Sequence, residues 1–494
     1  MNEHGQGQTV LKGYSLAGMA AGPAAALAML ILPVPAGLSF HGWATAAIAV
    51  WMAIWWATEA LPVAATALLP LVFFPLFGIF DFGRTAAPFA NPLIFLFLGG
   101  FLLSLALQRW NLHRRIALHI LSAVGDSPSA LVGGVMAATA FLSMWISNTA
   151  TAMMMMPLSV SLISVVTQEP AEGSSDAASE DGLPGKSGIS TALLLAVAYS
   201  ASIGGLATLV GSPPNALLAA YMEQRHGVHI GFAEWMAVGL PVALVLLPLT
   251  WLLLTRVVFH LDGTSTHASR QVIRRELDKM GPVSVPEIRV AAVFALVAAL
   301  WIFNPLIAGW LGPVSLHDAG IAISGALLLF VIPSGDRARV FLLDWNWAKR
   351  APWEILILFG GGLSLAQAVD NTGLAIWIGN GLAFFAAWPV FVLVIAVSVL
   401  VIFLTELTSN TATTAAFLPV VGAVAVTAGL DPMFLAAPAA LAASCAFMLP
   451  VATPPNAIVV GTGQVSIPQM MRAGFLVNLA AVAVIALMTL VTGN

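Results

Sequence analysis

The sequence predicts an all-helical (all-α), polytopic membrane protein with about eleven transmembrane helices and two re-entrant hairpins. Of its 494 residues, 60% are hydrophobic and only 8% are charged, whereas soluble domains carry roughly 25% charged residues. The apolar residues form continuous runs close to the roughly 20 residues that a spanning helix needs. The strands of a membrane barrel would instead alternate apolar and polar residues.

The first helix is expected within residues 1–36, where an apolar run covers about 16–32. Only Lys12 precedes this run, so a signal peptide is an alternative. Because the run is long and has no clear A-x-A exit, we expect an uncleaved helix. Further apolar runs predict spans at about 43–60, 62–79, 91–108, 189–221, 234–255, 288–309, 315–333, 353–369, 431–463 and 473–492. Polar residues interrupt two more apolar stretches, about 128–167 and 388–428, which we expect to form the hairpins.

The distribution of Lys and Arg predicts the orientation of the chain. With the N-terminus in the cytoplasm, all but two of the 18 Lys and Arg residues fall on the cytoplasmic side, and the two exceptions are Arg84 and Arg225. This imbalance satisfies the positive-inside rule. Because the number of spans is odd, the C-terminus is expected outside.

The sequence contains an internal repeat. Residues 144–157 (MWISNTATAMMMMP) match 406–419 (ELTSNTATTAAFLP), and GSPPN at 211–215 matches ATPPN at 452–456. The second match has a shorter spacing, and an acidic, Gly/Ser/Pro-rich insertion at 168–188 accounts for the difference. Such a composition is typical of a disordered loop.

These matches divide the chain into repeat 1 (37–255), a cytoplasmic connector (256–287) and repeat 2 (288–494). Each repeat contains five spans and one hairpin, and a Pro-Pro pair breaks one span of each repeat, at 189–221 and 431–463. Because five is odd, the second repeat starts on the opposite side of the membrane from the first. Inverted repeats with broken helices are typical of secondary transporters.

Polar clusters mark the middle of both hairpins. Ser147-Asn148-Thr149 and Ser409-Asn410-Thr411 carry hydroxyl and amide groups that donate and accept hydrogen bonds. Helix ends at the hairpin tips leave N–H and C=O groups free. The Pro-Pro pairs cannot sustain a regular helix and free further carbonyls. These groups predict a site that binds an anion with one set and Na⁺ with the other.

The distribution of charged residues favours Na⁺ as the coupling ion. No Lys or Arg lies between Arg115 and Lys186 or between Arg350 and Arg472, and no His follows His317. A bound anion must therefore be neutralised by helix N-termini and bound cations, and we expect at least two Na⁺ sites. Coupling to protons fits less well, because the first hairpin has no carboxylate.

Several other classes of protein are disfavoured. The single cysteine, Cys445, excludes a disulfide framework and a cysteine metal site. An enzyme is not expected, because the chain has no H-E-x-x-H or G-x-S-x-G motif, and the chain lacks the basic face of a nucleic-acid binder. Glu406 is the one acid of the second hairpin, where the first hairpin has Met144. Its carboxylate can act directly in the site or brace the hairpin.

The paired Ser-Asn-Thr motifs and Pro-Pro breaks resemble those of the divalent anion/sodium symporter family, the dicarboxylate and citrate carriers that include the "I'm not dead yet" transporters. The resemblance covers almost the whole chain. It implies Na⁺ ligands at Ser143, Ser147, Asn148 and Gly211 in the first half, and at Thr405, Thr408, Asn410 and Ala452 in the second. It implies substrate contacts at Asn148, Thr149, Ser212, Pro213, Asn410, Thr411, Thr453 and Pro454.

The resemblance further implies a homodimer in the bacterial inner (plasma) membrane, with a transport domain that moves like an elevator. It favours Na⁺-coupled import of C4-dicarboxylates such as succinate, malate and fumarate. The alternatives are a Na⁺-independent dicarboxylate exchanger and a carrier of citrate or another divalent anion. A channel would need a continuous polar pore, whereas two hairpins that meet at mid-membrane favour a gated site.

Overall fold

The computed structural model describes residues 13–125, 127–166, 188–261, 267–311, 316–335, 340–382, 384 and 388–492, and their regular elements are all helical. The first half contains α1 (Gly13–Ile31), α2 (Phe40–Thr58), α3 (Val63–Thr66), α4 (Leu69–Leu76), α5 (Phe82–Ala86), η1 (Ala87–Ala90), α6 (Pro92–Arg109), α7 (Leu112–Ser122), α8 (Pro128–Ser143), α9 (Asn148–Val166), α10 (Gly188–Gly205), α11 (Pro213–His226), α12 (Phe232–Leu252) and η2 (Leu253–Val258). The second half contains α13 (His267–Lys279), α14 (Val285–Leu311), α15 (Asp318–Val331), α16 (Trp345–Ala348), α17 (Trp353–Asn371), α18 (Leu374–Gly381), α19 (Val390–Thr405), α20 (Asn410–Thr427), α21 (Met433–Ala443), α22 (Pro454–Gly461) and α23 (Ile467–Thr492).

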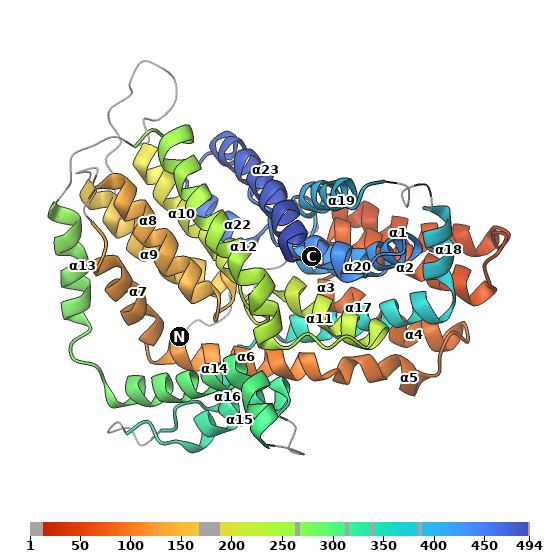
Figure 1. The fold of residues 1–494 in the computed structure, drawn as a ribbon, viewed down its shortest axis with the longest axis horizontal. Coiled ribbons are helices and arrows are strands. Elements are labelled where there is room, and N and C mark those ends of the chain that lie inside the picture. Colours follow the sequence, from red (N-terminus) through yellow and green to blue (C-terminus); the bar gives the residue numbers. More distant parts are fainter. Residues whose placement is uncertain are drawn as a thin grey trace.

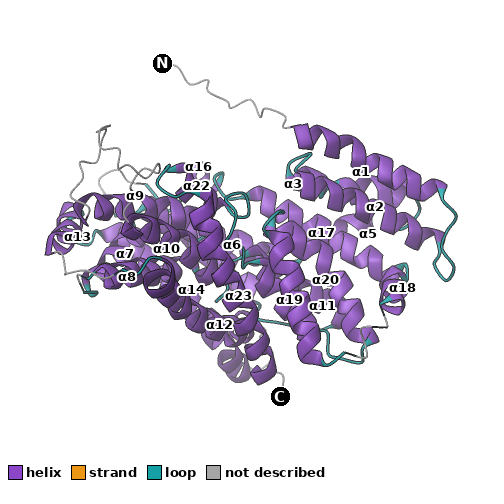
Figure 2. Cartoon of the chain, turned by 90° about the horizontal axis from the view of Figure 1, so that it is seen from above, coloured by secondary structure: helices purple, strands orange, loops and turns teal. Residues whose placement is uncertain are grey.

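The helices form two groups side by side (Figure 1). Helices α7 to α10 and α12 to α14 lie on the left of the view, whereas α1, α2 and α17 to α20 lie on the right. In the view from above, α1 and α2 lie next to each other at the end of the right-hand group (Figure 2). The predicted insertion at 168–188 falls almost entirely outside the described residues.

Six helices in the described residues are long and apolar enough to cross a membrane, and a bent pair makes a seventh. The six are Phe82–Arg109, Gly188–Gly205, Phe232–Val258, Val285–Ile307, Asn410–Thr427 and Ile467–Val491. The bent pair joins α17 to α18 at an angle of 73°. The polytopic helical fold is therefore confirmed, and the count of eleven spans stays a prediction, because several expected spans consist of shorter helices.

Helix breaks explain why these spans are short. The chain leaves the helical conformation at 144–147 between α8 and α9, and at 406–409 between α19 and α20. It does so again at 206–212 between α10 and α11, and at 444–453 between α21 and α22. Both α11 and α22 begin with Pro-Pro, which fits the first turn of a helix but cannot continue the preceding one.

The broken spans cross between the two groups of helices. Helix α11 of the first half packs against α20 and α21 of the second, and α22 of the second half packs against α9 and α10 of the first. Each break is therefore framed by both halves of the chain. This exchange brings segments that are far apart in sequence to the same region.

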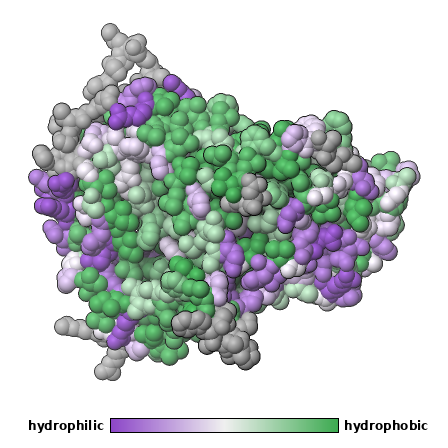
Figure 3. Space-filling model, viewed as in Figure 1, coloured by the Kyte–Doolittle hydropathy of each residue, from purple (hydrophilic) through white to green (hydrophobic). Residues whose placement is uncertain are grey.

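Much of the outer surface is apolar, as a lipid environment requires. Only 33% of the apolar window of Phe232–Val258 and 22% of that of Val285–Ile307 are buried inside the protein. In the space-filling view, hydrophobic residues cover the middle of the face shown, and hydrophilic residues gather at the left edge and the lower right (Figure 3). The face shown therefore has an extensive apolar surface suited to a bilayer.

Ion pairs fix the predicted connector to α7. Arg114 pairs with Glu276 of α13 at 2.5 Å, and Lys279 pairs with the same carboxylate at 2.6 Å. The hydrogen bond from Lys279, together with the nearby charges of Lys279 and Arg114, lowers the pKa of Glu276. Arg115 pairs with Glu287 at 2.8 Å and also donates to three backbone carbonyls. The three positive side chains, Arg114, Arg115 and Lys279, are therefore paired with carboxylates away from the hairpin tips.

Candidate functional site

The tip of the first hairpin forms a cluster of oxygen atoms with the first broken span. Ser143 ends α8 and Asn148 begins α9, and Ser143 Oγ lies 2.6 Å from both Asn148 Oδ1 and the Ala201 carbonyl oxygen. When its side chain is turned, the Asn148 amide donates to the carbonyls of Ala201 at 3.0 Å and Gly211 at 3.2 Å. Three oxygen atoms, from α8, α10 and the break, therefore surround one amide group.

The second hairpin has the same arrangement at its tip. Thr405 ends α19 and Asn410 begins α20, and Thr405 Oγ1 lies 2.8 Å from Asn410 Oδ1. The same hydroxyl lies 3.1 Å from the Ala443 carbonyl oxygen at the end of α21. In both halves, a buried hydroxyl five residues before an asparagine therefore ties that asparagine to a broken span.

A matched pair of asparagines holds the two breaks in shape. Asn215 Nδ2 donates to the carbonyls of Gly205 at 2.9 Å and Thr208 at 2.8 Å. Asn456 Nδ2 donates to the carbonyls ten and seven residues before it, at 3.1 and 3.0 Å. Neither asparagine was among the site residues predicted from sequence, although each follows a Pro-Pro pair. Both are fully buried, so they replace the hydrogen bonds that the broken helices lose.

The other predicted residues lie at the tips and breaks with different contacts. Ser147 Oγ accepts from Ala150 N at 3.4 Å, and Thr408 Oγ1 lies 2.6 Å from Thr413 Oγ1. These two hydroxyls are therefore engaged with their own hairpins, not with the asparagine amides. Ser212 and Thr453 occupy the N-cap positions of α11 and α22. Among the remaining residues, Thr411 and Ala452 are buried, Thr149 and Pro213 are half-buried, and Pro454 is exposed.

Glu406 braces the second hairpin against the second break. Its Oε1 accepts from Phe447 N at 2.7 Å, Met448 N at 2.9 Å and Asn478 Nδ2 at 2.8 Å. Its Oε2 accepts from Leu449 N at 2.9 Å. The carboxylate is 3% exposed. Of the two roles considered from sequence, the bracing role matches these contacts.

The first hairpin is joined to the first break by a hydrogen bond between uncharged groups. The hydroxyl of Thr208, in the first break, donates to the carbonyl of Met144, which stands where the second hairpin has Glu406. The same hydroxyl accepts from Gly211 N at 3.1 Å. The two halves therefore join hairpin to break at matching positions with different chemistry, and the second half alone places a carboxylate there.

Gly205 leaves room for the first cluster. A Cβ atom at this position would lie 2.6 Å from Asn148 Oδ1 and 3.0 Å from the Gly211 carbonyl oxygen. A backbone carbonyl cannot move aside as a flexible side chain can. The matching residue of the second break is Ala446. Its carbonyl accepts a hydrogen bond from Asn456, just as the carbonyl of Gly205 accepts one from Asn215. The first cluster is therefore the more closely packed of the two.

The two arginines predicted to lie outside meet at one end of α17. Arg225 Nε lies 3.0 Å from Asp370 Oδ1, and Arg84 Nη2 donates to Asn371 Oδ1 at 3.0 Å. Both guanidinium groups therefore have partners away from the hairpin tips. No Lys or Arg contact to either asparagine cluster occurs in the described part of the chain.

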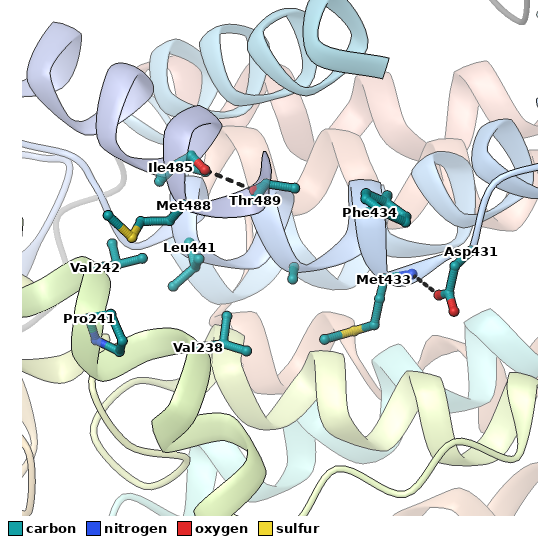
Figure 4. A pocket seen from close by; sticks show the side chains of 11 residues that line it. Val238, Pro241, Val242, Asp431, Met433, Phe434, Leu441, Ile485, Met488 and Thr489 are labelled. Carbon is teal, nitrogen blue, oxygen red and sulfur yellow. Dashed lines mark hydrogen bonds between the residues drawn. The ribbon is translucent and has the colours of Figure 1, made fainter. Parts of the chain in front are cut away.

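An apolar groove of about 330 Å³ lies between α12, α21 and α23 (Figure 4). Its lining is largely aliphatic, with side chains such as Val238, Leu441 and Met488, and its one charged lining group is the carboxylate of Asp431. That carboxylate accepts from Met433 N, at the start of α21, at 2.8 Å. An apolar lining with one negative group is unfavourable for a dianion. The polar clusters are therefore the better candidate for an anion site.

Comparison with known families places the chain among membrane transporters. A family model described as "Sodium:sulfate symporter transmembrane region" matches residues 15–494. The chain belongs to the sodium:sulfate symporter family. This is the family, also called divalent anion/sodium symporters, that the sequence motifs resemble, so the prediction is confirmed. Members of this family are transporters and not enzymes.

Individual relatives agree with this family. The chain is 41% identical over 474 residues to the sodium-dependent dicarboxylate transporter SdcS of Staphylococcus saprophyticus, a match that covers 96% of this chain and 90% of the relative. The fold is similar to that of the YdaH transporter of Alcanivorax borkumensis, with a TM-score of 0.54, 16% identity and coverage of 90% and 98% of the two chains. It is also similar to that of MtrF of Neisseria gonorrhoeae, with a TM-score of 0.56, 15% identity and coverage of 96% and 93%.

Proposed function

We propose that this protein is a secondary active transporter that imports C4-dicarboxylates such as succinate, malate and fumarate together with Na⁺. The observation that carries the proposal is the pair of matched asparagine clusters, Ser143 with Asn148 and Thr405 with Asn410, at the tips of two hairpins. These clusters are rich in oxygen and poor in positive charge. The name of the SdcS relative, a sodium-dependent dicarboxylate transporter, supports the same assignment.

The Asn148 amide is suited to a site that gains and loses a cation. In one orientation, its Oδ1 faces the carbonyl oxygens of Ala201 and Gly211, and a hard cation such as Na⁺ between them would stabilise this group of oxygens. In the other, its NH₂ group donates to those carbonyls, so the cluster is satisfied without an ion. We place the first Na⁺ here, with Ser143 and Ser147 as further ligands. The second Na⁺ is placed at Thr405, Thr408, Asn410 and Ala452.

Two Na⁺ ions would complete the charge balance of a bound dianion. Helices α9, α11, α20 and α22 all begin at the tips or breaks, and a helix N-terminus carries about half a positive charge. Such partial charges alone offset a dianion poorly once water is excluded. The proposed carboxylate contacts are Asn148, Thr149, Ser212 and Pro213 from the first half and Asn410, Thr411, Thr453 and Pro454 from the second.

The proposed setting is the inner membrane of a bacterium, with the N-terminus in the cytoplasm and the C-terminus outside. We propose a homodimer in which the hairpins and broken spans move as one body by an elevator motion. The packing of α11 on α20 and of α22 on α9 supports a single body, because each half holds a helix of the other. The alternative substrates are citrate and another divalent anion, since the description of the family names sulfate. The alternative mode is exchange without Na⁺.

Uptake into liposomes tests this function. The purified protein is reconstituted, and labelled succinate, malate, fumarate, citrate and sulfate are offered with an inward gradient of Na⁺ or of K⁺. We expect saturable uptake of the C4-dicarboxylates that requires the Na⁺ gradient. Uptake at equal rates in Na⁺ and K⁺, accompanied by counterflow, would instead establish an exchanger.

We expect Gly205→Ala to abolish Na⁺-dependent uptake while the protein still folds. The added methyl group would occupy the space between Asn148 and Gly211, where the first Na⁺ is placed. Gly461→Ala is the matched control, because a Cβ at Gly461 in α22 would meet nothing within 4 Å. The comparison is made as uptake per molecule of reconstituted protein over a range of Na⁺ concentrations. Normal Na⁺ dependence in Gly205→Ala would move the first Na⁺ site elsewhere.

A further inference from the structure

A hydroxyl pair joins the two breaks of the chain. Ser444 Oγ lies 2.8 Å from Ser212 Oγ, although the two residues are 232 positions apart. The residues are 1% and 2% exposed, so this contact is shielded from water. Ser212 directly precedes α11 and Ser444 directly follows α21, and α11 and α21 pack against each other.

Ser212 differs from its counterpart in what its side chain does. Thr453, at the N-cap of α22, accepts a hydrogen bond from Asn456 N at 3.3 Å. Ser212, at the N-cap of α11, makes no such bond and contacts Ser444 instead. A serine at an N-cap ordinarily bonds the backbone of its own helix. The Ser212 side chain therefore contacts Ser444 in place of the backbone of its own helix.

We propose that Ser444 is a positioning residue that aims the Ser212 hydroxyl at the carboxylate of the substrate. This inference rests on the proposed function. A hydroxyl has one proton to donate and can also accept. When Ser444 donates to Ser212 Oγ, the proton of Ser212 is free for a carboxylate oxygen. Ser444, in the second half of the chain, thereby fixes the direction in which the Ser212 hydroxyl of the first half donates.

The first half has a matching residue without this contact. Ser143 donates to the carbonyl of Ala201 in the first half, and Thr405 donates to the carbonyl of Ala443 in the second. Ser202 and Ser444 directly follow these two alanines, so they hold corresponding positions in the two halves. Ser202 is also 1% exposed, but its Oγ has no hydrogen-bond partner among the described residues. Ser202 is therefore a control of the same type, burial and position, without a contact to a proposed substrate residue.

The test is a comparison of Ser444→Ala with Ser202→Ala in reconstituted liposomes. For Ser444→Ala we expect the KM for succinate to rise about 3- to 10-fold, as the loss of one ordinary hydrogen bond would produce, with little change in Vmax. The dependence of uptake on Na⁺ concentration is expected to stay that of the unaltered protein. Ser202→Ala should leave the KM unchanged, and Ser444→Thr, which keeps the hydroxyl, should restore much of the affinity.

A double-mutant cycle separates positioning from a general effect on packing. If Ser444 acts through Ser212, the variant with both alanines will have the KM of Ser212→Ala alone. Multiplied effects in the double variant, equal effects of Ser202→Ala and Ser444→Ala, or an unchanged KM in Ser444→Ala would each overturn the proposal. Failure of the unaltered protein to take up any dicarboxylate with Na⁺ would count against the proposed function, a result distinct from these three.

Discussion

Replacing Asn148 by alanine is expected to reduce Na⁺-driven dicarboxylate uptake to background. The Asn148 amide lies within hydrogen-bonding distance of Ser143 Oγ and of the carbonyls of Ala201 and Gly211. Its loss removes one partner from each of these groups, although Ser143 and Ala201 still bond each other, at a cost of ~1–3 kcal/mol in a low-dielectric site, which corresponds to as much as roughly 100-fold in binding. Asn410→Ala is expected to have the same effect, because Asn410 holds the matching position beside Thr405.

The measurement is the initial rate of succinate uptake per reconstituted molecule, with folding checked by size-exclusion chromatography. Asn371→Ala is the control, because Asn371 is exposed at the end of α17, away from both tips. Near-normal uptake by either Asn148→Ala or Asn410→Ala would show that the site has been placed wrongly.

The second large effect is expected for Glu406→Ala, and it concerns stability as much as transport. The carboxylate accepts from three consecutive backbone N–H groups, at residues 447 to 449, and from Asn478. Without it, these donors lose their acceptor, and each of the two buried ones, Phe447 N and Asn478 Nδ2, would cost about 1–3 kcal/mol if unsatisfied. We therefore expect a marked fall in the thermal unfolding temperature in detergent together with the loss of uptake.

Two further variants show whether Glu406 acts as a brace. Glu406→Gln keeps one oxygen acceptor and should destabilise less than Glu406→Ala, whereas Glu354→Ala removes an exposed carboxylate and should leave the unfolding temperature unchanged. A Glu406→Ala protein of normal thermal stability that has lost its response to Na⁺ would contradict the bracing role. Such a protein would instead assign Glu406 to the site itself.

The sequence predicted the helix breaks because they follow from local chemistry. Pro213-Pro214 and Pro454-Pro455 cannot continue a helix, and the structure begins α11 and α22 at these residues. The turns at Ser147 and Ser409 were likewise visible as polar clusters inside apolar stretches. The number of residues in each helix was harder to predict, because a broken span reads as one apolar run. Hence 189–221 reads as one span, although the structure divides it into α10 and α11.

Contacts between distant segments could not be predicted in the same way. Nothing in the spacing of the chain pairs Ser212 with Ser444, or Glu406 with Asn478, because these contacts depend on how the broken spans cross. The repeat also gives no signal for the first pair, since the two breaks, 206–212 and 444–453, differ in length. Asn215 and Asn456 did have a visible signal, as each follows a matched Pro-Pro pair, but their role required the positions of the carbonyls they bond.

Binding of succinate by the purified protein in NaCl, KCl and choline chloride of equal ionic strength tests whether bound Na⁺ neutralises the substrate. If the Asn148 and Asn410 clusters bind Na⁺ that neutralises the dianion, succinate will bind at least about 10-fold more tightly in Na⁺ than in K⁺ or choline. By linkage, succinate will raise the affinity for Na⁺ by the same factor. Equal affinity for succinate in the three salts would show that Na⁺ does not neutralise the dianion and would favour the Na⁺-independent exchanger.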